Sequence, residues 1–82
     1  MKYVVILRNS IETPVIFPET ESHIDHVNRS LDKMLSAGFC RFGVDPDGTL
    51  GVSCWGKSDS LRVLSRLVED EDLILRHNEF SA

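Results

Sequence analysis

Two histidines three residues apart, His23 and His26, are the first side chains here whose type and spacing could do chemistry. On a helix they would be surface neighbours, and two imidazoles can contribute to a zinc site. Such a site needs three or four ligands, and the sequence has no Cys-x-x-Cys or His-Glu-x-x-His pattern to complete one. We therefore favour two solvated histidines over a metal site, and we expect no cofactor.

Cys40, Cys54, Ser58 and Ser60 are the candidate redox and nucleophilic groups. The two cysteines could form a redox-sensitive pair, but a free cysteine is more often a small buried hydrophobe. The serines lie in no Gly-x-Ser-x-Gly elbow, so capping or loop hydroxyls are the preferred interpretation. Without a catalytic constellation, we expect the protein not to be an enzyme.

Phe39, Arg41 and Trp55 are the candidate binding residues. An aromatic pair with a nearby arginine is typical of a protein interface anchor. The same three side chains could stack a nucleic-acid base on a sheet surface. Alternatively, the aromatic rings only cover the edge of the sheet, or a later segment folds over them.

A β-hairpin from Gly38 to Trp55 must position these residues. Its turn, Asp45-Pro46-Asp47-Gly48-Thr49, has proline at the first corner and glycine where φ must be positive. This turn pairs Asp45 with Thr49 and so fixes the register of both strands. One side of the hairpin is then apolar, with Cys40, Phe42, Val44, Leu50, Val52 and Cys54, while Phe39, Arg41 and Trp55 share the other side.

The residues before this hairpin predict two strands and a helix. Tyr3 to Leu7 is apolar throughout, which indicates a central strand buried on both faces. A short edge strand follows at 15–17, between two prolines. From Ser22 onward, apolar residues recur every three or four positions and predict a helix that ends at Gly38. Its apolar stripe would consist of Ile24, Val27, Leu31, Met34 and Leu35.

Residues 58–76 allow two interpretations. In one, Ser58 or Asp59 caps a helix that is followed by a strand at 73–75, giving a ferredoxin-like β-α-β-β-α-β fold. In the other, a strand at 60–64 precedes a helix that Ser65 caps, with Leu67, Val68, Ile74 and Leu75 on its buried side. Periodicity slightly favours the first. Both predict one α+β domain over residues 1–82, with an antiparallel sheet of four or five strands and one or two helices on one face; the second has the order β-β-α-β-β-(β)-α.

Several short motifs resemble a group of small uncharacterised proteins encoded in phage, prophage and bacterial genomes. They are Ser-Ala-Gly-Phe-Cys at 36–40, Cys-Trp-Gly-Lys-Ser-Asp-Ser-Leu at 54–61, and Ser-Arg at 65–66 before an acidic run. The resemblance implies strand and then helix after residue 58, although Arg62 and Leu67 stand where the group has glycine and proline. Because the group has no known activity, the resemblance indicates neither a reaction nor catalytic residues.

Composition limits the partners. The chain has 82 residues and a net charge of −4, which argues against a general nucleic-acid surface. Its apolar N-terminal run is too short for a membrane span, and the sequence lacks a signal-peptide pattern, so we expect a cytoplasmic protein without membrane contact. A domain this small is marginally stable, which favours a protein partner or a homodimer. We therefore expect a non-enzymatic interaction protein, with a nucleic-acid module or a small metal-binding protein as alternatives.

Overall fold

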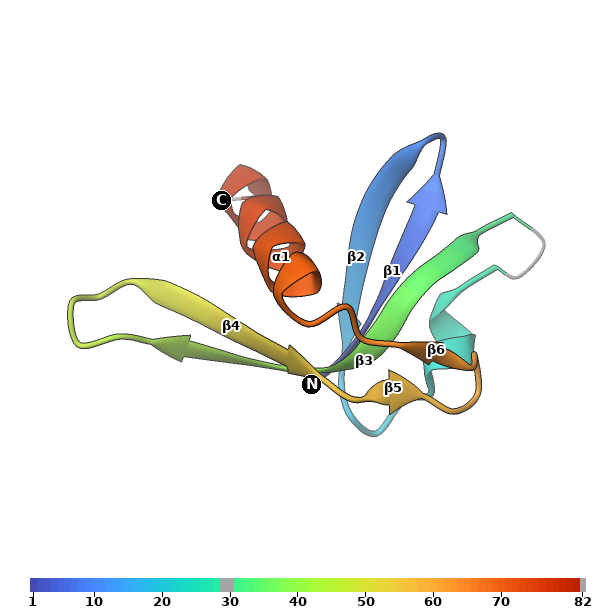
Figure 1. Ribbon diagram of the computed structural model, residues 1–82, viewed down its shortest axis with the longest axis horizontal. Coiled ribbons are helices and arrows are strands. Elements are labelled where there is room, and N and C mark those ends of the chain that lie inside the picture. The colour runs from blue at the N-terminus through green and yellow to red at the C-terminus, as the bar shows by residue number, and fades with distance from the viewer. Residues whose placement is uncertain (29–30, 82) are drawn as a thin grey trace.

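Four antiparallel strands form the main sheet of the computed structural model, which describes residues 1–28 and 31–81, with the backbone only for 78–81 (Figure 1). They are β1 (Lys2–Arg8), β2 (Ile11–Phe17), β3 (Lys33–Val44) and β4 (Leu50–Trp55), in the spatial order β2-β1-β3-β4. A small second sheet pairs β5 (Lys57–Ser58) with β6 (Val63–Leu64). The helical elements are a short 3-10 turn, η1 (His23–His26), and the helix α1 (Val68–Ser81).

The α+β class and the central hairpin are confirmed. β3 and β4 pair in the predicted register, from Phe39 opposite Trp55 to Val44 opposite Leu50. The turn is closed by hydrogen bonds between the Asp45 and Gly48–Thr49 backbones, and Gly48 has φ of +86°. β1 lies between β2 and β3 and is buried on both faces, and β2 is an edge strand as expected, although it is longer than predicted.

The helix predicted from Ser22 to Gly38 is wrong over the residues that the structure describes. Only the single turn η1 is helical, and β3 already begins at Lys33; residues 29 and 30 lie outside the described part. Gly38 does not end a helix but lies inside β3 opposite Tyr3. A side chain there would collide with the Trp55 carbonyl oxygen, so glycine is needed for close packing instead of for a helix cap.

Pairing with β1 explains why a helical pattern became a strand. β1 is apolar on both faces and must be hydrogen-bonded along both edges, and β3 supplies the second partner. The register between β1 and β3 shifts between Val5 and Ile6, which makes Leu35 an extra residue in β3. This bulge puts Leu35 on the same face as Ser36 and leaves Met34 on the opposite face. Leu35 therefore packs with one core cluster and Met34 with the other. Their spacing reflects two faces of a sheet, and tertiary pairing overrides the local preference.

After residue 58 the chain forms a short strand and then a helix, so the ferredoxin-like alternative is wrong. Ser65 lies three residues before the first residue of α1, and its hydroxyl accepts a hydrogen bond from the amide of Leu67, which has a φ of +54° and is not helical. Ser65 therefore does not cap the helix as predicted. Ile74 is fully buried against the sheet, but Leu67 and Val68 are mostly exposed, contrary to expectation. Arg62 and Leu67 are the two positions where the sequence differs from the group that it resembles. Both adopt a positive φ.

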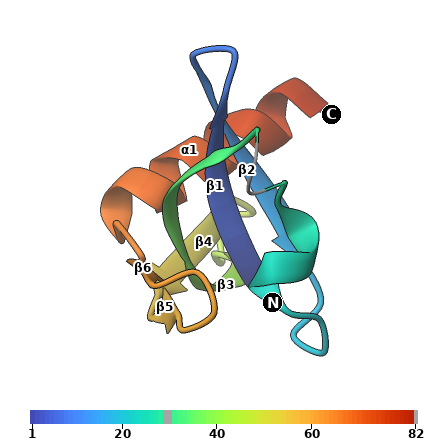
Figure 2. The same ribbon diagram turned by 90° about the vertical axis from the view of Figure 1, so that its right-hand side faces the viewer.

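The main sheet is covered on both faces, and each face has its own core cluster. On one face Ile74 of α1 packs against the sheet residues Tyr3, Val5, Cys40, Val52 and Cys54, while η1 and the loop around β5 and β6 lie on the other side of β1 (Figure 2). The second cluster contains Val4, Ile6, Phe17, Ala37 and Leu61. One α-helix, within the predicted one or two, forms the helical layer on one face in the described residues. None of these residues forms a helix with the length and apolarity needed to cross a membrane.

A fully buried carboxylate, that of Asp70, joins α1 to the sheet. Oδ2 accepts hydrogen bonds from the Tyr3 hydroxyl at 2.5 Å and from the Arg66 amide at 2.8 Å. Oδ1 accepts from Ser36 Oγ at 2.8 Å and from Arg66 Nε at 2.9 Å. Arg66 also donates to Glu12 on β2 at 2.8 Å. Ser65 Oγ lies 2.6 Å from the Tyr3 hydroxyl oxygen. This network, the Asp70 cluster (Tyr3, Ser36, Ser65, Arg66 and Asp70), links β1 and β3 to the helix, and Glu12 extends it to β2.

We expect Asp70→Ala to be strongly destabilising. The change leaves the Tyr3 hydroxyl, Ser36 and Arg66 without their shared acceptor, and breaking a buried ion pair costs about 3–5 kcal/mol of unfolding free energy. Asp72→Ala, an exposed acid on the same helix, is the matched control and should cost less than about 0.5 kcal/mol. Urea denaturation measures both; similar losses for the two variants would contradict the structural role of Asp70.

Candidate interaction surface

Trp55 is the largest side chain that the fold leaves open to solvent. It is 46% exposed, and its ring stacks on that of Phe39 with centroids 6.2 Å apart and an interplanar angle of 21°. The pairing of β3 with β4 places the two residues directly opposite each other. Trp55 is therefore both exposed and held by a stacked neighbour, which limits the freedom it would lose on binding.

The ring of Phe39 is itself packed against His23 and the backbone at Gly56. The buried ring of His23 meets it edge-on at 6.2 Å and 87°. Gly56, the residue after Trp55, has φ of +82°, and a β-carbon there would lie 2.9 Å from the Phe39 ring. The ring of Phe39 is thus packed between η1 and the start of the β5 segment, and only Trp55 of the pair is largely exposed. This position was not evident from the sequence, because it depends on η1.

Two hollows border Trp55. One, of about 360 Å³, is lined by Phe39 and Trp55 together with Lys2, Ser22, His23, Gly56, Lys57, Asp59 and Ser60. The other, of about 550 Å³, is lined by Met1, Glu19, Cys40, Arg41, Phe42 and Trp55. We call Phe39, Arg41 and Trp55 the Trp55 surface. The structure brings these three sequence-predicted residues to one side of the hairpin, with Arg41 and Trp55 bordering the same hollow.

The two histidines do not act as a pair. His23 is buried, and its Nε2 donates a hydrogen bond to the Gly38 carbonyl at 2.9 Å. His26 stacks on Phe17 at 4.0 Å, and its Nε2 lies 2.8 Å from Glu21 Oε1. Among the described residues no group of three or more His, Cys, Asp and Glu side chains could hold a metal ion. The expectation of two solvated histidines is wrong for His23, because η1 turns it into the interior.

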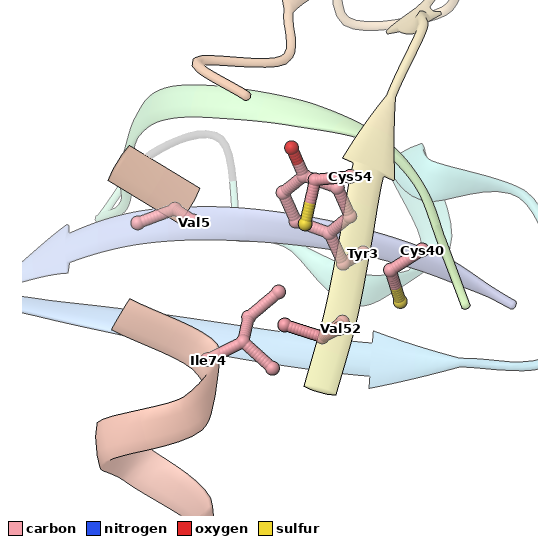
Figure 3. Close-up of a cluster of buried hydrophobic side chains, with 6 residues drawn as sticks. All are labelled: Tyr3, Val5, Cys40, Val52, Cys54 and Ile74. Carbon is pink, nitrogen blue, oxygen red and sulfur yellow. The ribbon is translucent and has the colours of Figure 1, made fainter. Parts of the chain in front are cut away.

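Cys40 and Cys54 lie opposite each other in the core, as the register predicts (Figure 3). Their amides point away from each other, to the Met1 carbonyl and to Glu71 Oε2, so they form a non-hydrogen-bonded pair with Cα atoms about 4.5 Å apart. That spacing permits a disulfide, but both thiols are free. Burial raises the pKa of Cys54 to about 12 and also raises the pKa of Cys40, which disfavours the reactive thiolate.

Ser58 and Ser60 lie close together without a histidine. Ser58 is buried, its Oγ is 3.2 Å from Ser60 Oγ, and it accepts a hydrogen bond from the Leu61 amide at 3.2 Å. These contacts stabilise the turn between β5 and β6. Ser60 also borders the smaller hollow beside Trp55.

Sequence reasoning missed the Asp70 cluster. Asp70 belongs to a run of four acids that looks solvated, and its buried partners come from segments 34 and 67 residues away in the chain. One signal was available: a tyrosine in a central buried strand needs a hydrogen-bond partner for its hydroxyl. Burial, together with Asp70, raises the pKa of Tyr3, which keeps this hydroxyl protonated as a donor.

Comparisons with known proteins add no family or relative, since no protein-family model, curated protein or solved structure matches the chain.

We expect stability to fall as the pH drops below about 6.5, and His23 to account for much of this loss. Burial lowers the pKa of His23 from its usual 6.5, while its hydrogen bond to Gly38 partly offsets the shift. The unfolded chain therefore binds a proton before the folded one, and stability is lost between the unfolded and the folded pKa. Urea denaturation at pH 7.5 and pH 5 measures it. His23→Gln retains a donor for Gly38 and should reduce the difference; an unchanged difference would contradict it.

We expect both thiols to resist alkylation in the folded protein. At pH 8 the raised pKa values and burial should slow the reaction with iodoacetamide at least about 100-fold relative to urea-unfolded protein. Mass spectrometry of timed samples counts the modified cysteines. Rapid labelling of either cysteine under native conditions would show that the thiol is accessible and would restore the redox hypothesis.

Proposed function

We propose that this chain is a non-enzymatic interaction protein of the kind that phage and prophage genomes encode. It would associate with itself or with a host protein through the Trp55 surface. The observation that carries the proposal is the exposure of Trp55, which is 46% exposed although it stacks on a packed phenylalanine. Exposed aromatic groups beside an arginine are typical anchors of protein interfaces.

The roles of the reactive groups support a binding function over a catalytic one. Four of the candidate reactive residues in the described part of the chain are buried: His23, Cys40, Cys54 and Ser58. His23 and Ser58 also form hydrogen bonds with the protein's own backbone, at Gly38 and Leu61. A general base or nucleophile has to reach a substrate from a cleft, with a pKa suited to its task. Trp55 and Arg41, in contrast, are exposed and lie beside a hollow.

The geometry favours a protein partner over nucleic acid. The two lysines beside the stacked rings are already engaged: Lys2 Nζ donates to the Glu21 carbonyl at 2.9 Å, and Lys57 lies 3.5 Å from Asp59. With a net charge of −4, the local positive charge needed to bind phosphates is therefore weak. Stacking on Trp55 and the charge of Arg41 are the parts of a nucleic-acid site that are present in the described structure.

The test replaces Trp55, the only tryptophan in the chain, with alanine. Ile11→Ala is the matched control, because Ile11 is a 64% exposed hydrophobe at the turn between β1 and β2. Size-exclusion chromatography with light scattering, from about 10 to 500 μM, measures self-association. Tryptophan fluorescence, titrated with single-stranded oligonucleotides, measures stacking. We expect Trp55→Ala to weaken self-association, or binding of a purified host partner, at least about 10-fold, and oligonucleotides to leave the fluorescence unchanged.

Two results would contradict this proposal. In the first, the protein is a monomer over the whole concentration range, and wild type and Trp55→Ala bind any captured and purified host protein equally well. The other is salt-reversible quenching of Trp55 by oligonucleotides, which would favour the nucleic-acid alternative. Circular dichroism and urea denaturation of both variants would show that the fold is retained.

A further inference from the structure

The hairpin of β3 and β4 continues beyond the rest of the sheet as a two-stranded arm. The pairing of β3 with β1 ends at Phe39 opposite Lys2, with one more contact from the Cys40 amide to the Met1 carbonyl. From Arg41 to Ser53 the hairpin has no neighbour strand in the described structure (Figure 1). The arm gives the molecule its long axis, 43 Å against 26 and 19 Å. We call residues 41–53 the arm.

The apolar side of the hairpin starts in the core and ends in solvent. Cys40 is fully buried, Phe42 is half-buried, and Val44 is 69% exposed; on β4, Val52 is buried and Leu50 is 44% exposed. An isolated two-stranded hairpin is marginally stable in water, because too little of its apolar face is covered. The outer half of the arm therefore has both apolar side chains and backbone groups available for a partner.

The free backbone groups of the arm can be identified by alternation. In an antiparallel pair, successive amides point alternately toward and away from the partner strand. Asp45 N–H points to Thr49 on β4, while Cys40 N–H points away from β4 to Met1. Phe42 and Val44 lie two and four residues after Cys40, so their N–H and C=O groups point in the same direction as those of Cys40, outward from the β3 edge. Such an edge is a template for another strand.

The opposite edge of the arm is closed at its base. The outward-facing amide of Cys54 donates to Glu71 Oε2 at 2.9 Å, and α1 lies on the β4 side of the hairpin (Figure 1). An incoming strand would displace this carboxylate contact. The β3 edge has no such cover between Arg41 and Val44 in the described structure, and is therefore the edge open to pairing.

We propose that a second copy of this chain pairs its β3 edge with this one, antiparallel about a twofold axis at Gly43. In that register Phe42 lies opposite Val44 of the second copy, which joins the two exposed apolar stripes. Phe42 and Val44 would exchange about four backbone hydrogen bonds across the axis. No side chain stands at the axis, since Gly43 has open space around it. The proposal rests on the proposed function, because it names the partner as a second copy.

Charge complementarity selects this register. It places Arg41 opposite Asp45 of the second copy, twice in the dimer, on the side of the arm that carries Gly43. These are non-hydrogen-bonded pairs, in which opposed side chains come closest and opposite charges stabilise the sheet. Neither Arg41 nor Asp45 forms an ion pair within the described chain, and both are exposed. A slip of one residue would oppose unlike faces and lose both ion pairs.

The same register brings the partner's turn to the Trp55 surface. The paired segment of the second copy would end with its Asp45 opposite Arg41, because Met1 occupies the edge position beside Cys40. The partner's turn would then follow next to the hollow of about 550 Å³ that Met1, Arg41, Phe42 and Trp55 help to line. The interface therefore extends from the arm to the hollow at its root. Because only a short strand pairs, we expect the association to be of the weak, transient class.

A charge swap tests the register. Arg41→Asp places acids opposite acids, Asp45→Arg places arginines opposite arginines, and each change alone should weaken self-association at least about 10-fold. An equimolar mixture of the two variants restores both ion pairs and should form a heterodimer, and the doubly swapped chain should self-associate like wild type. Sedimentation equilibrium at low salt measures the dissociation constants. Failure of the mixture and of the double variant to recover would overturn the register.

Two proline variants test which edge pairs. Val44→Pro removes an outward amide of the β3 edge without removing a β3–β4 hydrogen bond, and Leu50→Pro does the same on the β4 edge. We expect Val44→Pro to abolish dimerisation and Leu50→Pro to leave it unchanged, with circular dichroism confirming that both fold. The reverse result would overturn the proposal.

The outcomes separate this proposal from the proposed function. Self-association that Trp55→Ala weakens but Val44→Pro and the charge variants do not would overturn the arm dimer and leave the interaction function intact. A wild-type monomer at 500 μM would also overturn the arm dimer, while binding of a purified host protein that needs Trp55 would still support the interaction function.

Discussion

The buried carboxylate of Asp70 is the interaction on which the arrangement of helix and sheet depends. An ionised group in the interior is costly unless hydrogen bonds and an opposite charge satisfy it. Here Tyr3, Ser36 and Arg66 do so, and they come from β1, β3 and the segment just before α1. Because these donors meet only when the strands are paired and the helix is docked, the cluster requires the sheet and the helix to form together.

Once the helix is docked, the two ends of the hairpin differ. At the base, α1 covers Cys40, Val52 and Cys54, and Glu71 occupies an edge amide. At the tip, the same apolar stripe continues to Val44 without cover. No element of the described residues covers this outer part of the stripe. The proposed contact with a second copy or another protein would supply the missing cover.

Local chemistry made part of the structure predictable. The turn at 45–49 closes a hairpin by itself, since Pro46 and Gly48 suit its dihedral angles, and the register follows from the turn. The positions of the two cysteines and the placement of Phe39 with Trp55 on one side follow from that register. The central position of β1 was also predictable, because only a strand buried on both faces would be apolar throughout.

The sequence by itself therefore determined the central hairpin, the inner strand and the side of the sheet on which Trp55 lies, because turn geometry and the two-residue period of a strand are local properties. Only the tertiary structure decided that 33–37 is strand, that His23 is buried, and that Asp70 is a buried acceptor instead of a solvated acid. Each of these depends on partners far away in the chain: β1 needs hydrogen bonds along its second edge, and Asp70 needs donors from two strands. Such contacts between distant segments cannot be predicted from the local spacing of residues along the chain.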